Sequence, residues 1–291
     1  MKYHHTFALN SKTQTYEQIV FIGSHSFHGA KAYVRKKFIN VIKTYPRGTT
    51  FVNLFGGSGL LSHITKHFHP ESHVVYNDFD NYRLRILNIP RTNMLLHQLR
   101  DLTSGLQRHK MIPAEIKAQI ISLLENELTE TGYLDLITLS SSILFSMKYR
   151  TTIDELRKET LYNNIRKSDY KPCPGYLDGL EITSCDYKEV FNQYKDKPGT
   201  VFIIDPPYLS TEVGPYSGYW TLSDYLDVLN LLSGHNYIYF TSDKSSIIEL
   251  CQWLGRNPHL GNPFDGANEF RMKRHVNFNA GYTDIMLYKS L

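Results

Sequence analysis

The sequence has few cysteines and no long apolar run. Its three cysteines (Cys173, Cys185 and Cys251) are widely spaced and odd in number, which argues against a disulfide framework or a four-cysteine metal site and predicts a reducing compartment. The apolar runs are far shorter than the roughly 20 residues that cross a bilayer. The residues from Met1 to His5 lack the apolar region of a secretory signal. We therefore expect a cytoplasmic protein that is not embedded in a membrane.

A metal site is also not expected, although the chain has 13 histidines. His63 and His67 are one helical turn apart, but Ile64 stands where a zinc metalloprotease has its glutamate, and no third ligand is evident. A solvated helix face accounts for the pair. The net charge of +4 and the pI near 8.7 permit a polyanionic partner without requiring one.

The most informative segment is Asp205-Pro206-Pro207-Tyr208, which follows the apolar run Val201 to Ile204. A short apolar run rich in β-branched residues is typical of a buried parallel strand. The prolines end the strand abruptly and stiffen the backbone after it. Open α/β sheets bind ligands beyond the carboxyl ends of their strands, so these four residues are candidates for a ligand site. An ordinary strand followed by an Asp-Pro turn is the alternative interpretation.

The four residues suit a planar base with an exocyclic amine, which is a poor nucleophile because its lone pair is delocalised. Asp205 and the carbonyl of Pro206 can accept the two N–H groups and turn the lone pair towards an electrophilic methyl group. Tyr208 can stack on the base. We predict Asp205, Pro206, Pro207 and Tyr208 as the catalytic residues of an amine methyltransferase.

Strands and helices alternate along both ends of the chain, which predicts βαβ units and a parallel sheet. Expected strands cover 50–55, 72–76, 180–183, 200–204 and 237–240, and the segments 271–278 and 282–288 indicate an antiparallel hairpin at the sheet edge. A helix is expected over 60–68. Between about Pro90 and Gly175 only helical patterns occur, over 111–129 and 133–148. The predicted architecture is an α/β catalytic domain (1–89 and 176–291) interrupted by a helical insertion (90–175).

A glycine loop, Phe55-Gly56-Gly57-Ser58-Gly59, follows the first strand and opens a helix. Glycines allow close approach of the backbone to a ligand, and helix N-terminal amides favour an anionic group. Asp78 follows about 20 residues later, where an acid can bind ribose hydroxyls. NAD and S-adenosylmethionine (AdoMet) both fit this spacing, and a tight structural turn is the simpler alternative. The segment 205–208, which is predicted to bind an amine, has no role in hydride transfer, so it favours AdoMet over NAD.

The order of these motifs resembles that of Dam-type DNA adenine-N6 methyltransferases, whose recognition region precedes the catalytic motif. Gly29-Ala30-Lys31 is similar to the family's amino-terminal Gly-x-Lys segment, and Cys185-Asp186-Tyr187 is similar to the motif whose acid contacts the cofactor adenine. The chain differs at Asn53, where the family commonly has an acid. The resemblance implies a Rossmann-like, AdoMet-dependent methyltransferase sheet. It assigns the following residues to the cofactor: Lys31, Phe55, Gly56, Gly57, Ser58, Gly59, Asp78, Asp186 and Asp205. Asp186 is also a candidate helix N-cap.

A base in duplex DNA must be flipped out of the stack to reach such a pocket. Tyr219 and Trp220, in a Gly-rich segment after Tyr208, are candidates for a lid over the base; a loop tucked onto the core is the alternative. Phosphate contacts require Lys and Arg, and the run from 148 to 171 offers Lys148, Arg150, Arg166 and Lys167. Acidic residues interrupt this run, so a solvated helix face is the alternative there.

The sequence thus predicts transfer of a methyl group from AdoMet to N6 of a flipped adenine in duplex DNA. Methylation of RNA adenine or of cytosine N4 is one alternative, because the catalytic segment serves any conjugated amine. A non-catalytic DNA-binding module is another. A separate restriction nuclease is a possible partner, since this chain has no nuclease motif, and the oligomeric state is left open.

Overall fold

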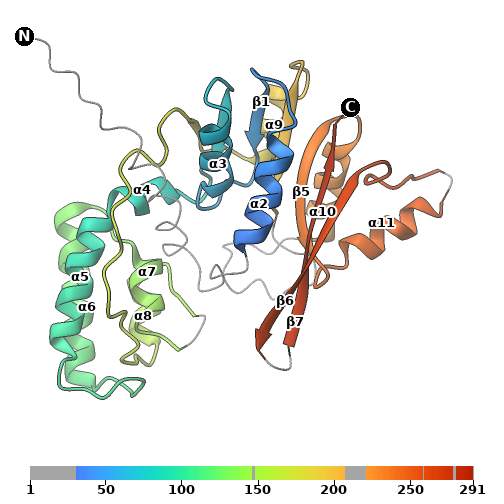
Figure 1. Cartoon of the computed structure of the whole chain (residues 1–291). Coiled ribbons are helices and arrows are strands. Elements are labelled where there is room, and N and C mark those ends of the chain that lie inside the picture. The colour runs from blue at the N-terminus through green and yellow to red at the C-terminus, as the bar shows by residue number, and fades with distance from the viewer. Residues whose placement is uncertain (1–30, 146–147, 207–220, 258, 278–279, 291) are drawn as a thin grey trace, which may run out of the picture. The chain divides into compact units, whose positions relative to one another are not determined.

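The computed structural model describes residues 31–145, 148–206, 221–257, 259–277 and 280–290 (Figure 1). The chain divides into two compact units. Within the described part of the chain, the sheet unit comprises residues 31–82 and 177–290, and the helical unit comprises residues 83–176.

The sheet unit contains seven strands in the order β3-β2-β1-β4-β5-β7-β6. Their bounds are β1 Thr50–Asn53, β2 Val74–Asn77, β3 Glu181–Thr183, β4 Thr200–Ile204, β5 Asn236–Ser242, β6 Asn268–Asn277 and β7 Ala280–Lys289. The first five are parallel, and β7 runs antiparallel between β5 and β6. This confirms the predicted Rossmann-like methyltransferase sheet, mostly parallel with an antiparallel hairpin at the carboxyl-terminal end.

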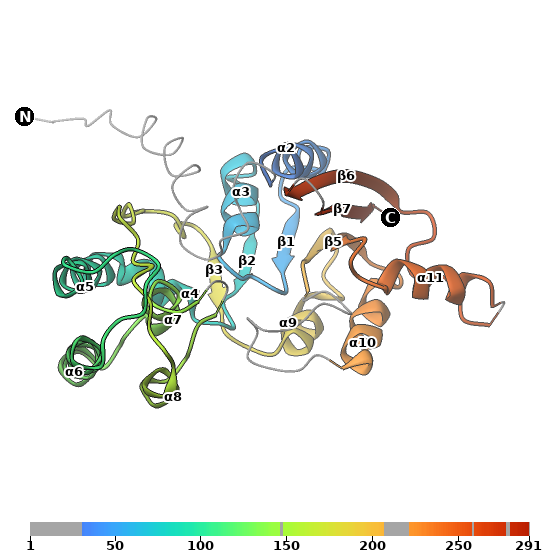
Figure 2. The same cartoon turned by 90° about the horizontal axis from the view of Figure 1, so that it is seen from below.

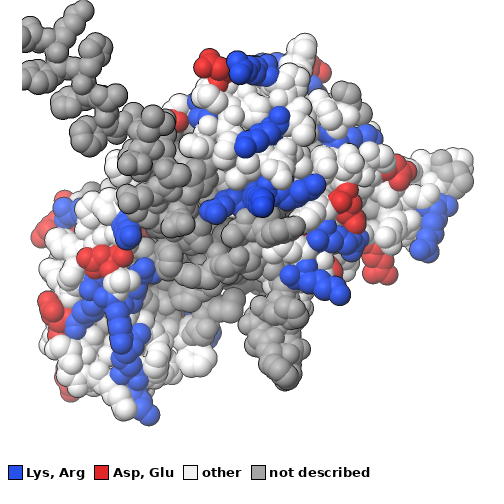
Figure 3. Space-filling view, in the orientation of Figure 1, with Lys and Arg blue, Asp and Glu red and all other residues white. Residues whose placement is uncertain are grey.

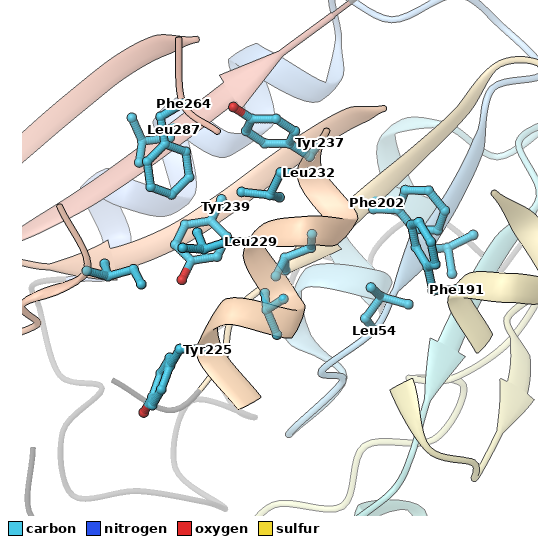
Figure 4. Close-up of a cluster of buried hydrophobic side chains, with 14 of the residues drawn as sticks. Leu54, Phe191, Phe202, Tyr225, Leu229, Leu232, Tyr237, Tyr239, Phe264 and Leu287 are labelled. Carbon is cyan, nitrogen blue, oxygen red and sulfur yellow. The ribbon is translucent and has the colours of Figure 1, made fainter. Parts of the chain in front are cut away.

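Helices cover both faces of the sheet (Figure 2). Helices α2 (Lys31–Ile42) and α3 (Leu60–Phe68) lie on one face, and α9 (Tyr187–Tyr194) and α10 (Leu222–Leu232) lie on the other. On the α9 face, inward-pointing strand residues such as Phe202 and Tyr239 pack with residues of α9, α10 and α11 (Ile247–Gly255) in one buried cluster (Figure 4). Strands β2 and β4 are buried along their whole length, as expected for a sheet covered on both faces.

The helical unit contains α5 (Ile89–Leu102), α6 (Ala114–Thr131), α7 (Leu136–Ser141) and α8 (Ile153–Lys158), and α4 (Tyr82–Leu87) begins at the boundary. It has its own hydrophobic core, built from buried leucines and isoleucines of these helices. Arg85 Nε donates to Oδ1 of the buried Asp135 (3.1 Å), and Asp135 also caps α7. No helix among the described residues is both long enough and apolar enough to span a bilayer.

Two helix predictions for this unit differ from the structure. The helix expected over 111–129 begins at Ala114, after Pro113, and ends at Thr131, where Gly132 adopts a left-handed conformation (φ 70°). Among the described residues, the helix expected over 133–148 is confirmed only for Leu136–Ser141, because α7 begins and ends there. The hydroxyls of Ser141 and Ser142 donate to carbonyls three residues earlier, at 2.8 and 2.7 Å. Such local bonds compete with helix continuation.

Candidate active site

The sheet order brings the predicted cofactor loop and the catalytic segment to neighbouring strand ends. Strand β1 lies between β2 and β4, with Asn53 in register with Tyr76 on one side and Ile203 on the other. The glycine loop, Asp78 and Asp205 therefore all follow the carboxyl ends of adjacent parallel strands. The order reverses between β1 and β4, which is the point where open α/β sheets bind ligands.

The glycine loop crosses close over the end of β2. A Cβ atom on Gly56 would lie 2.3 Å from Cε2 of Tyr76 and 2.4 Å from the carbonyl oxygen of Asn77. The Gly56 amide donates to that carbonyl at 3.2 Å. Gly57 and Gly59 have φ values of 48° and 74°, and Gly59 is the N-cap of α3. Gly56 is therefore required by the close crossing, and the other two glycines by backbone conformation.

Asp78 is buried at the start of the segment after β2, with 3% of its surface exposed. Its Oδ1 accepts from the Tyr82 amide (2.6 Å) and from the Tyr76 hydroxyl (2.9 Å). The same hydroxyl donates to the carbonyl of Gly57 at 2.8 Å. Tyr76 thus links the predicted ribose-binding acid to the glycine loop, a role that sequence reasoning missed.

Asn77 joins three strand ends through its side chain. Its Nδ2 donates to the carbonyls of Leu54 (3.0 Å) and Cys185 (2.9 Å), and its Oδ1 accepts from the Cys185 amide (3.1 Å) and the Thr183 hydroxyl (3.3 Å). The residue is almost fully buried. The side-chain amide of Asn77 therefore holds the loop that follows β1 against the segment that carries Asp186.

Asp186 caps α9, since its Oδ1 accepts from the Lys188 amide at 2.8 Å. This is the alternative role considered for it, and its side chain is exposed. A contact with cofactor adenine stays a prediction. Next to it, the ring of Tyr187 lies 5.0 Å from the ring of Phe55, so α9 packs against the first residue of the glycine loop.

Asn53 is fully buried at the end of β1. Its Nδ2 donates to the Ser62 hydroxyl at 2.9 Å. Its Oδ1 has no hydrogen-bond partner among the described residues. Buried acceptors are almost always paired, so this oxygen is a candidate for binding a donor from a ligand.

Asp205 and Pro206 follow β4 directly; Asp205 is partly buried and Pro206 is buried. The neighbouring strand places Tyr239 beside them. Burial raises the pKa of Tyr239 far above its usual range, and Cys251, Tyr225 and the Asp205 carboxylate add to the rise. The Tyr239 phenol therefore stays protonated. Pro207, Tyr208, Tyr219 and Trp220 lie outside the described residues, and Lys31 is placed only as the first residue of α2.

The four predicted phosphate contacts all belong to the helical unit, where Lys and Arg side chains gather on the face that Figure 3 shows. Lys148 and Lys167 are exposed. Arg150 forms an ion pair with Glu159, and Arg166 stacks over the ring of Tyr170 at 4.5 Å. Arg150 thus contributes to the fold of this unit, and its role towards DNA stays a prediction. His63 and His67 belong to no group of metal-ligating side chains within the described ranges.

Comparison with known proteins identifies the family, although no family model matches the chain. A protein of Haemophilus influenzae named "Putative methyltransferase" is 33% identical over 246 residues, which cover 83% of this chain and 82% of that protein. This chain belongs to the same methyltransferase family.

Solved structures are more distant. A SAM-dependent methyltransferase from Agrobacterium tumefaciens has a TM-score of 0.38 at 10% identity; the match covers 89% of this chain and 61% of that longer chain. An rRNA methyltransferase from Streptomyces viridochromogenes has a TM-score of 0.36 at 11% identity, with 99% of this chain and 96% of that chain covered. The class defined by the sheet and the family is the Rossmann-like methyltransferases. This class takes its methyl group from AdoMet, the cofactor predicted from the glycine loop.

Proposed function

We propose that this methyltransferase transfers the methyl group of AdoMet to N6 of an adenine flipped out of DNA. The observation that carries the proposal is the position of Asp205 and Pro206. They follow β4, next to the end of β1 and beyond the point where the strand order reverses. A carboxylate and a prolyl carbonyl at this point offer two acceptors for one exocyclic amine.

The residues around the glycine loop fit AdoMet. Gly56 crosses close to the end of β2, and α3 begins directly after the loop that follows β1, so its first amides lie at the carboxyl edge of the sheet. The unpaired Oδ1 of Asn53 suits an ammonium donor, and the Asp78 carboxylate suits ribose hydroxyls. AdoMet supplies an electrophilic methyl group, and Asn53, the glycine loop and Asp78 would hold it.

The role of the chain's own residues is to orient the amine. Asp205 accepts one N–H and the Pro206 carbonyl accepts the other, which localises the nitrogen lone pair. The N–H proton becomes acidic only once the nitrogen has been methylated, so no strong base is needed. Positioning and electrostatic complementarity of this kind are large contributors to catalysis.

DNA is proposed rather than RNA because the order of the motifs along the chain, with the helical segment before β4, matches the Dam-type pattern. The catalytic segment itself serves either substrate. The two are separated by incubating the protein with labelled AdoMet and either unmethylated bacterial DNA or ribosomal RNA, followed by identification of the modified nucleoside.

Asp205→Asn is the test variant, because it keeps the shape and replaces one acceptor by a donor. Asp196→Asn is the matched control; Asp196 is exposed and lies before β4, at the opposite edge of the sheet. We expect labelled N6-methyladenine in DNA with the wild type and with Asp196→Asn, and at least a hundredfold less with Asp205→Asn. Labelling of RNA alone would contradict the choice of DNA while keeping the role of Asp205.

A further inference from the structure

Three segments of the helical unit run side by side at its surface. The Tyr162 amide donates to the carbonyl of Ile143 (2.7 Å), which joins the segment after α8 to the segment after α7. On its other side, the Asn163 amide donates to the carbonyl of Lys110 at 2.9 Å. Met111 and Tyr162 form an antiparallel bridge. Residues far apart in the sequence are therefore held on one surface by main-chain bonds.

This surface exposes large apolar side chains. Phe145 and Met111 are each 64% exposed. The ring of Phe145 lies 5.9 Å from the ring of Tyr162, at an angle of 66°. Phe145 and Met111 both adjoin Tyr162, so they belong to one exposed apolar surface, and contiguous exposed apolar surface marks a site for a partner or ligand.

Two lysines belong to the same main-chain segments as these side chains. Lys110 precedes Met111 in the chain, and the Lys148 amide donates to the main-chain carbonyl of Phe145 at 3.1 Å. Both lysines are exposed, and within the described part of the chain neither side chain forms an ion pair. By contrast, Arg150 and Arg157 of the same unit pair with Glu159 and Glu125. The lysine charge at this surface is therefore available to an anionic partner.

We propose that Lys110, Met111, Phe145, Lys148 and Tyr162 form a stacking surface for the nucleic-acid substrate. An unpaired base would stack on Phe145, backed by Tyr162, and the two lysines would contact the phosphates on either side of that base. The inference rests on the proposed function only in taking a nucleic acid as substrate. An aromatic face with flanking cations recognises a single-stranded or locally opened region, since every base has a π-face. A substrate from which one base has been flipped offers such a region.

The stacking arm of the test uses a fluorescein-labelled single-stranded oligonucleotide of mixed sequence, with affinity measured by anisotropy. Stacking on one aromatic side chain is worth about 1–3 kcal/mol per base. We expect Phe145→Leu to weaken binding on the order of tenfold, because leucine keeps the apolar surface but loses the ring. Phe145→Tyr should bind like the wild type. Thermal unfolding of each variant confirms that the helical unit stays folded.

The phosphate arm uses the double variant Lys110→Gln/Lys148→Gln and the slope of log K against log salt concentration. Each lost phosphate contact lowers that slope by about 0.7 for a single strand, so the double variant should lower it by about 1.4. Lys195→Gln is the matched control, because Lys195 is exposed at the end of α9, in the other unit. Its slope should equal that of the wild type.

The proposal is overturned if Phe145→Leu binds like the wild type, or if the salt slope of the double variant is unchanged. It is also overturned if Phe145→Leu converts a dimer into a monomer in sedimentation while leaving nucleic-acid affinity unchanged, since the surface would then serve self-association. These binding results do not depend on methyl transfer. Absence of methylated product with intact binding would count against the proposed reaction alone.

Discussion

Gly56 passes so close to Tyr76 that a Cβ atom on the glycine would lie 2.3 Å from Cε2 of the ring. Real Cβ atoms do not approach side chains this closely, so any larger residue must displace either the loop or the tyrosine. Because the Tyr76 hydroxyl binds both Gly57 and Asp78, a displaced ring also disturbs the acid. One close contact therefore couples the glycine loop to Asp78, the two parts of the predicted cofactor site.

Gly56→Ala tests this coupling. We expect AdoMet affinity, measured by calorimetry, to fall at least tenfold and the melting temperature to fall as well, because overpacking costs about 1–3 kcal/mol. Gly105→Ala is the control: its added Cβ meets no atom within 4 Å and its φ is not positive. Unchanged AdoMet affinity in Gly56→Ala would show that the loop does not hold the cofactor.

Tyr76→Phe isolates the hydroxyl. The hydroxyl has a single proton, which the Gly57 carbonyl and the buried Asp78 carboxylate share, so the change removes one donor, and an unpaired buried acceptor costs about 1–3 kcal/mol. We expect the free energy of unfolding in urea to fall by about that amount. Tyr45→Phe makes the same chemical change where the hydroxyl has one long bond of 3.4 Å to a carbonyl, and should cost much less. Equal losses in the two variants would rule out a special role for Tyr76.

The strand predictions and the predicted place of the glycine loop, between β1 and α3, are confirmed, because each depends on a short stretch of sequence. The apolar run before Asp205 and the two prolines after it determine where β4 ends. Asn77 binds the carbonyls of Leu54, 23 residues before it, and of Cys185, 108 residues after it. No local sequence pattern predicts contacts between residues so far apart. The helix expected over 133–148 fails for a related reason: its apolar spacing is helical, but the serine hydroxyls of 140–142 bind the local backbone instead.

A pH-dependent contribution to stability is expected at Glu181, the first residue of β3. Hydrogen bonds from Tyr194 (2.7 Å) and from His73 lower the pKa of Glu181 in the folded protein, with the bond from Tyr194 the largest cause. A carboxyl whose folded pKa lies below the unfolded value of about 4.3 stabilises the protein fully above that value. The contribution is lost as the pH falls through the folded pKa.

Urea unfolding of the wild type and of Glu181→Gln at pH 7 and at pH 3 checks this. The variant should be less stable than the wild type at pH 7, and the gap should shrink at pH 3. Glu189→Gln serves as the control, because Glu189 is exposed on α9. Its replacement should leave the free energy of unfolding equal to that of the wild type at both pH values. A gap of the same size at pH 3 would mean that packing, rather than charge, explains the loss.

Asn53→Asp asks whether the unpaired oxygen at the end of β1 faces the cofactor. The substitution removes the amide that donates to Ser62 and puts a negative charge in a fully buried position, where an unpaired charge costs several kcal/mol. The free protein should therefore melt at a lower temperature than the wild type. If Asn53 binds the ammonium group of AdoMet, the carboxylate gains a charged partner on binding, so saturating AdoMet should raise the melting temperature of Asn53→Asp more than that of the wild type.

Asn77→Asp is the control, since it places the same charge among the fixed carbonyls of Leu54 and Cys185. Its loss of stability should persist in AdoMet, and equal behaviour of the two variants would place the unpaired oxygen of Asn53 outside the cofactor site.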